Sequence, residues 1–217
     1  MKSAKTTSVR TLLLLTLMAV CALLLCGAQS QAAQPVRQQK LLFEAPGQNA
    51  IIMSAKQLYK PQELDLNVKY SAKASGFFVL KPNTPLGSGF ETTAVCGQNG
   101  VDLLAGLSQQ QMLGDGYMNG IDDQGNLKDS YYVQMSAFDL DKDGVREVLV
   151  FVGNRLSELR AYIFRFTGGQ EPFKFVGAID GQSQMSFDKG SIISPVGTQG
   201  IFDEYKYSKG KLTQIKN

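Results

Sequence analysis

The strongest constraint on the fold of this chain is a series of short apolar runs in its C-terminal half. Each run is rich in β-branched and aromatic residues, which is typical of strands. Short Gly-containing segments separate them, for example Asp143-Gly144, Gly168-Gly169 and Lys209-Gly210. Strands this close in sequence can be joined only by hairpins, so we expect an antiparallel meander. The runs are residues 130–138, 145–152, 159–166, 173–179, 191–196, 201–207 and 211–215.

The sequence preceding these runs predicts helix as well as strand. Apolar residues between 49 and 59 recur at helical spacing, and Pro61 follows them. Residues 101–113 carry several leucines, with Asp102 near the start and Gly114 after the end. These patterns predict one or two short helices in the N-terminal half. With the meander, they predict a single α+β domain over residues 41–217.

The first 33 residues predict an export signal. Three basic side chains precede the 17-residue apolar stretch 11–27, and the small residues that follow it suit a cleavage site near Ala33. We therefore expect removal of residues 1–33, a linker over residues 34–40, and an extracytoplasmic location in the periplasm, at the cell surface or outside the cell. Removal takes away three basic and no acidic residues and leaves 19 of each sign. A neutral chain has no bulk electrostatic reason to bind nucleic acid.

Histidine and cysteine content restricts the chemistry. The chain contains no His, which excludes the Ser-His-Asp triad and the usual zinc sites. Cys21 and Cys26 lie in the export signal, so Cys96 alone remains after cleavage, and we expect it to be a buried apolar residue. Cys26 leaves one alternative open. The segment 23–27 faintly resembles a bacterial lipoprotein cleavage site, and acylation there would tether the protein to a membrane.

An acidic segment carries the sharpest functional signal. Asp139, Asp141, Asp143 and Glu147 place four carboxylates within nine residues, and two neighbouring basic residues offset only half of that charge. Unpaired, these carboxylates repel one another, whereas a hard divalent cation collects them. Alternate spacing lets the aspartates point inward from a tight loop, and Gly144 allows the turn. The carbonyl of Val145 can add a ligand, and this all-oxygen set favours calcium.

The acidic segment is not an EF-hand. Position twelve counted from Asp139 is Val150, where an EF-hand needs a bidentate Glu, and strands flank the loop. The segment instead resembles the calcium loop of FG-GAP and VCBS repeats, which occur in β-propeller blades of secreted and cell-surface proteins. That resemblance implies that Asp139, Asp141 and Asp143 bind calcium, that Glu147 opens the next strand, and that residues 148–152 form a buried strand. It covers about fifteen residues, so it extends to the loop and not to a propeller.

Other interpretations of the acidic residues stay open. The loop at 139–147 can also be a solvated hairpin turn, because Asp and Gly favour turns without any ion. If calcium binds, we expect a structural role and an affinity on the order of 0.1 to 1 mM, as in extracellular modules. The acidic residues between 115 and 129 are expected to form an ordinary polar loop. Asp203 and Glu204 suggest a glycosidase pair, but neighbours on a strand face opposite ways.

The sequence therefore predicts an exported, non-enzymatic binding or surface-associated module stabilised by calcium. Its expected partner is another protein or an envelope polymer. Two alternatives are a carboxylate-based extracytoplasmic hydrolase and a lipoprotein with a scaffolding role, tethered through Cys26. In the binding role, Asp203, Tyr205 and Tyr207 share one face of a predicted strand and can contact a sugar or peptide, although cross-strand packing also explains them.

Overall fold

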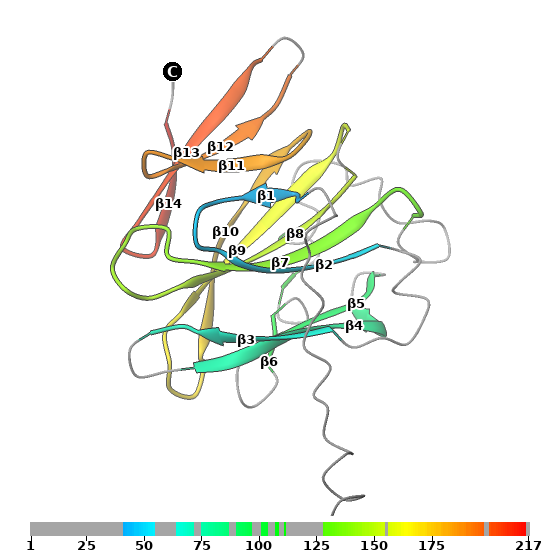
Figure 1. Cartoon of the computed structure of the whole chain (residues 1–217), viewed down its shortest axis with the longest axis vertical. Coiled ribbons are helices and arrows are strands. Elements are labelled where there is room, and N and C mark those ends of the chain that lie inside the picture. Colours follow the sequence, from blue (N-terminus) through cyan, green and yellow to red (C-terminus); the bar gives the residue numbers. More distant parts are fainter. Residues whose placement is uncertain are drawn as a thin grey trace, which may run out of the picture. The chain divides into compact units, whose positions relative to one another are not determined.

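The computed structural model describes residues 41–54, 64–71, 75–86, 90–96, 101–103, 107–108, 111, 128–154, 156–197 and 200–215 (Figure 1). Of the strands between Leu64 and Asp102, only the backbone is described. All these residues belong to one compact unit, Val36–Asn217. The predicted export signal, with Cys21 and Cys26, and the predicted linker over residues 34–40 lie outside the described residues. No helix long and apolar enough to cross a membrane occurs in the described ranges.

The predicted α+β class is wrong, because the elements that the structure describes are all strands. Asn49–Ser54 forms strand β2 and not the start of a helix, and residues 55–59 lie outside the description. Val101–Asp102 forms the short strand β6, and most of the remaining predicted helix is likewise not described. A short apolar run such as Ile51-Ile52-Met53 fits a helix or a doubly buried strand equally well by its pattern. Pairing with a distant strand decides in favour of β2.

The central sheet has the strand order β10-β9-β8-β7-β2, and every neighbouring pair is antiparallel. Consecutive strands β7 to β10 are adjacent, so the predicted hairpins are confirmed here. β2 joins at the far edge, where Asn49 pairs with Ala137 and Ser54 with Tyr132. The strands are β2 (Asn49–Ser54), β7 (Tyr132–Phe138), β8 (Glu147–Gly153), β9 (Leu159–Phe166) and β10 (Phe173–Gly181).

A second sheet has the order β1-β11-β12-β13-β14 and contains the rest of the predicted hairpins. Its four last strands are antiparallel neighbours, and β1 pairs with β11 in parallel. Lys209 and Gly210, both with positive φ, form the two-residue turn between β13 and β14. The strands are β1 (Phe43–Glu44), β11 (Met185–Asp188), β12 (Ser191–Pro195), β13 (Phe202–Ser208) and β14 (Lys211–Ile215). The sequence patterns missed β1 and β11.

A third, antiparallel sheet has the order β3-β4-β5-β6. Tyr70 follows β3 and Leu103 follows β6, and both side chains pack against the central sheet. Tyr70 also stacks on Phe166 of β9, with ring centroids 5.0 Å apart. The strands are β3 (Leu64–Lys69), β4 (Ser75–Leu86), β5 (Phe90–Cys96) and β6 (Val101–Asp102).

Strand β8 is buried along its whole length, because both faces of the central sheet are covered. Val148, Val150 and Val152 belong to one apolar cluster, with Tyr70 and Leu103. Leu149 and Phe151 belong to a second cluster, shared with side chains of β1, β11, β12 and β13. This alternation follows from the two-residue period of a strand. The fully buried β8 starts at Glu147, so the acidic loop is anchored to the best-packed element of the described fold.

A buried glutamine fixes the start of the described chain to the central sheet. Oε1 of Gln134 in β7 accepts hydrogen bonds from the N–H groups of Leu42 (2.6 Å) and Phe43 (3.2 Å). Its Nε2 donates to the carbonyl of Phe43 (3.1 Å) and to Ser136 Oγ (2.6 Å). The side chain amide thus replaces a strand partner for the backbone of residues 42 and 43.

Candidate metal centre

The acidic loop connects β7 to β8 and is closed at its base by the pairing of Phe138 with Glu147. Asp139 organises the loop from within. Its Oδ1 accepts the N–H of Asp143 (3.1 Å), and its Oδ2 accepts the N–H of Gly144 (2.9 Å). Gly144 has a φ of 86°, a left-handed conformation that glycine adopts without strain, as the sequence predicted for the turn. The carboxylate of Asp139 therefore holds the turn in place through the backbone.

Glu147 is completely buried and has three hydrogen-bond donors around its carboxylate. Oε2 accepts the N–H of Leu140 (3.0 Å), and Oε1 accepts the hydroxyl of Tyr207 (3.0 Å) and Nη1 of Arg165 (3.0 Å). Burial raises the pKa of Glu147 to about 7, although the hydrogen bonds from Leu140 and Tyr207 act in the opposite direction. The buried carboxyl of Glu147 therefore holds its proton more tightly than an exposed glutamate does.

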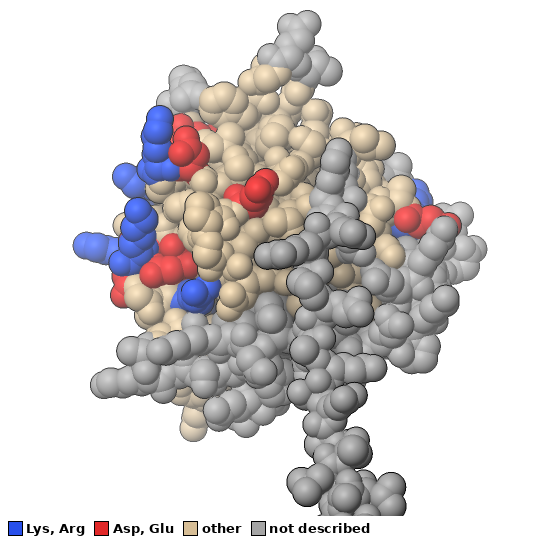
Figure 2. All heavy atoms as spheres, in the orientation of Figure 1, with Lys and Arg blue, Asp and Glu red and all other residues tan. Residues whose placement is uncertain are grey.

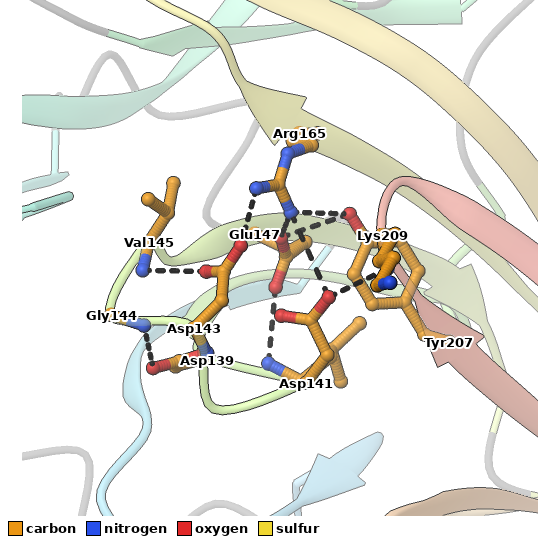
Figure 3. A network of polar contacts seen from close by, with 10 residues as sticks. Asp139, Asp141, Asp143, Gly144, Val145, Glu147, Arg165, Tyr207 and Lys209 are labelled. Atoms are coloured by element: carbon orange, nitrogen blue, oxygen red, sulfur yellow. Dashed lines mark hydrogen bonds and ion pairs between the residues drawn. The ribbon is translucent and has the colours of Figure 1, made fainter.

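Arg165 of β9 is the positive charge inside the network (Figure 3). It lies directly opposite Glu147 in the β8–β9 ladder. Its Nη1 is 3.0 Å from Glu147 Oε1 and 4.0 Å from Asp141 Oδ2, and its Nη2 contacts Asp143 Oδ2. Hydrogen bonds to Asp143 and Tyr207 raise the pKa of the guanidinium, so Arg165 is charged at every accessible pH.

The side chain of Asp143 is turned toward Arg165. Its Oδ1 accepts the N–H of Val145 (2.9 Å), and its Oδ2 faces the Arg165 guanidinium. Slight burial disfavours the charged form, but the hydrogen bonds from Arg165 and Val145 outweigh it and lower the pKa of Asp143. Val145, whose carbonyl the sequence suggested as a ligand, thus contributes its N–H group to the network.

Asp141 has an oxygen without a partner. Its Oδ2 accepts the N–H of Lys209 in the β13–β14 turn (2.8 Å), but its Oδ1 is buried and has no hydrogen-bond partner among the described residues. The Asp141 side chain is only 9% exposed. A buried, unsatisfied carboxylate oxygen is costly, and each such atom in a folded protein calls for a missing partner such as an ion or water.

Asp139, Asp141 and Glu147 form a group that could hold a metal ion. Each offers one carboxylate oxygen, and the three oxygens lie within 4.8 Å of one another. The sequence predicted five metal ligands. The structure brings three of them together, and it places Asp143 and Val145 beside them in other contacts. Asp139 and Asp141 are partly exposed and Glu147 is buried, so the group lies at the rim of the domain core. Oxygen-only ligands suit a hard cation.

The exposed surface of the protein carries both signs of charge. On the face drawn in Figure 2, acidic and basic side chains lie next to one another along one side. Neither sign forms a continuous field over the described residues visible there. The potential at the candidate centre is therefore set by its nearest charges, because more distant exposed charges are screened by salt.

The sequence patterns did not predict that three further residues contact the acidic loop: Arg165, Tyr207 and Lys209. They come from β9, from β13 and from the β13–β14 turn, so only the folded topology brings them to the loop. One signal for Arg165 was present, because it is one of only two charged residues, with Arg160, in the run 159–166. Pairing that run with β8 in a hairpin places the arginine opposite Glu147.

The other acidic candidates do not form a pair. Asp203 and Glu204 pair with consecutive residues of β12, Ser194 and Ile193, as expected for neighbours that face opposite sides. Asp203 and Tyr205 do share a face, and both line a groove of about 300 Å³, whose lining also includes Asp180. Asp180 forms an ion pair with Arg160. The acidic residues between 115 and 127 lie outside the description, as does any contact they make.

Comparison with known proteins gives this chain no family. No protein-family model, no curated protein and no solved structure matches it. Three acidic side chains close together do not define a repeat, so the resemblance of the loop to FG-GAP and VCBS repeats remains a prediction from the residues themselves.

Proposed function

We propose that this protein is an exported, non-enzymatic binding or surface-associated module whose β-sheet body is stabilised by one calcium ion. The ion is held by carboxylate oxygens of Asp139, Asp141 and Glu147. The partner of the module is another exported protein or an envelope polymer. Export and partner rest on the sequence alone, through the N-terminal segment and the neutral charge of the remaining chain.

One observation carries the metal part of the proposal: Oδ1 of Asp141 is buried and unpartnered beside two further carboxylates. A divalent cation would satisfy this oxygen and offset the mutual repulsion of the group. Calcium is favoured because the donors are all oxygens, and because calcium accepts irregular geometries and water ligands that magnesium tolerates poorly. Calcium is also available outside the cytoplasm at the millimolar level that a weak site needs.

A cation at this position would act as a structural link. It would connect the β7–β8 loop to the start of β8, and through Asp141 and Glu147 to the β13–β14 hairpin, which contacts both side chains. This linking of separate elements supports a structural role for the ion.

The proposal is tested by thermal unfolding of the purified chain with millimolar calcium or with chelator. We expect calcium to raise the melting temperature of the wild-type chain. Asp141→Asn keeps the size of the side chain but removes its charge, so the calcium shift should be lost. Asp188→Asn is the matched control, because Asp188 is exposed and lies outside the group. Identical melting curves of the wild-type chain with calcium and with chelator would reject the metal site.

A carboxylate-based hydrolase is the second candidate function, and the groove lined by Asp180, Asp203 and Tyr205 is the observation that favours it. Glycoside hydrolysis needs two carboxyl groups in one cleft. Asp180 forms an ion pair with Arg160 and Asp203 does not share in it, so the two carboxylates of the groove have different surroundings. Hydrolysis of envelope polysaccharide that disappears in Asp203→Asn would support this candidate, and equal product with and without the protein would reject it.

A further inference from the structure

We infer that Arg165 is an internal competitor of the metal ion and lowers the calcium affinity of the site. The inference rests on the proposed calcium site at Asp139, Asp141 and Glu147. It concerns the regulation of that site: a positive side chain of the protein occupies the space in front of the carboxylates when no ion is bound, and the ion must overcome it.

The contacts of Arg165 overlap with those of the ion. Nη1 lies 3.0 Å from Glu147 Oε1 and 4.0 Å from Asp141 Oδ2, so the guanidinium engages two of the three candidate ligands. A cation bound to those carboxylates would lie close to the guanidinium. Like charges at such a separation, partly shielded from water, repel strongly enough to change binding by an order of magnitude or more.

Contacts outside the proposed metal ligands keep the guanidinium of Arg165 close to the site. Nη1 also donates to the hydroxyl of Tyr207 (3.1 Å), and Nη2 is held by Asp143. The side chain is 22% exposed, and its stem lies against the β13–β14 turn, where a Cβ at Gly210 would be 3.5 Å from Arg165 Cδ. Arg165 is therefore fixed near the site by groups outside the metal set.

Asp143 takes a distinct role in this arrangement. It stands outside the group of three but binds the second nitrogen of the guanidinium (Figure 3). When Glu147 turns to a cation, Arg165 keeps Asp143 and Tyr207 as partners and stays charged and hydrogen-bonded. The exchange then costs the ion pairs of Arg165 with Glu147 and Asp141 and not the whole arginine network. This accounts for a loop that is ordered without an ion and still able to accept one.

The test compares calcium affinities of full-length variants by isothermal titration with calcium chloride. Arg165→Gln removes the charge, and we expect at least about a tenfold lower Kd than in the wild-type chain. Arg165→Lys keeps the charge, and we expect a Kd within about threefold of the wild type. An arginine with a purely structural role would predict the opposite for the glutamine variant, namely weaker binding as the loop loosens.

The outcomes separate the inference from the proposed function. No binding to the wild-type chain or to either variant contradicts the calcium site itself. Binding to the wild type that is unchanged or weakened in Arg165→Gln overturns the competition by Arg165. If Arg165→Gln is unfolded without metal by circular dichroism, we expect calcium to refold it at a lower concentration than the wild-type Kd. Failure of calcium to refold it overturns the inference as well.

Discussion

Burial makes the ionisation of Glu147 costly. It is fully buried at the start of β8, and burial raises its pKa to about 7 from an ordinary value of 4.5. The native state therefore holds the proton more tightly than the unfolded chain does between these two values. A carboxyl of this kind stabilises the fold while it is protonated and loses that contribution as pH rises.

We predict that, in the presence of chelator, the free energy of unfolding falls as pH rises from about 4.5 to about 7. The loss from this group is at most about 3 to 4 kcal/mol. Saturating calcium should reduce the loss, because the ion binds the deprotonated form and calcium affinity should rise with pH over the same window. Urea unfolding at half-unit pH steps measures both effects.

The matched variant for this prediction is Glu147→Gln, which does not titrate. Its stability should depend less on pH across the same window, whatever its absolute value. Asp143 does not interfere, because its pKa is lowered and its contribution changes only below about pH 4. A wild-type stability that stays flat or rises between pH 4.5 and 7 in chelator would contradict the account of Glu147.

At this scale, the sequence predicted part of the site and missed the rest for a definite reason. The alternate spacing of Asp139, Asp141 and Asp143 indicated convergence within one loop, which local geometry can express. The local pattern could not distinguish Asp143, whose orientation depends on Arg165 from another strand. Arg165 and Tyr207 reach the loop only through sheet pairing, and such long-range contacts have no local signature.

At the scale of single elements, β1 is the least self-sufficient strand. It has two residues, pairs in parallel with β11, and depends on Gln134 of β7 for further hydrogen bonds. Short parallel pairing contributes little by itself. The hydrogen bonds of the buried Gln134 amide therefore contribute much of the stability that keeps residues 42 and 43 in place.

We predict that Gln134→Leu destabilises the protein by about 2 to 4 kcal/mol, because two buried N–H groups lose their partner, while the Phe43 carbonyl keeps the hydrogen bond from Gln48. Gln184→Leu is the control: Gln184 is exposed and its side chain donates a hydrogen bond to Glu44, so its effect should stay within about 0.5 kcal/mol. Chemical denaturation measures both. Equal stabilities of Gln134→Leu and the wild type would show that residues 42 and 43 do not need the amide.

The elements also show why the predicted fold class failed in one half of the chain. The C-terminal runs are separated by short turns, and that spacing alone forces hairpins. Residues 49–54 lack such a constraint, because their partner β7 lies some eighty residues further along the chain. Ile51 and Met53 face one cluster and Ile52 the other, so a continuous apolar run reflects burial on both faces and not helical period.

At the scale of the whole described unit, β8 connects two apolar clusters through one sheet. Phe151 lies in the cluster shared with the second sheet, where it stacks on Phe43 with ring centroids 5.0 Å apart. Val150, its neighbour in sequence, lies in the opposite cluster. Loss of packing on either face is therefore expected to weaken the same strand.

We predict that Phe151→Ala lowers the free energy of unfolding by about 3 to 5 kcal/mol while the protein still unfolds in a single transition. Phe202→Ala is the control, because Phe202 is 45% exposed, and its effect should be much smaller. Unfolding in urea is followed by two probes, far-ultraviolet circular dichroism for the strands and tyrosine fluorescence for the packing of the side chains. Two separate transitions in the wild-type chain would contradict the coupling of the two faces through β8.

The most direct measurement of the central claim is anomalous diffraction from crystals of the protein grown with calcium. We predict one anomalous peak about 2.3 to 2.6 Å from carboxylate oxygens of Asp139, Asp141 and Glu147, with Arg165 drawn away from Glu147 toward Asp143. A map at saturating calcium with no peak there, and with Arg165 still bound to Glu147, would contradict the claim that these carboxylates hold an ion.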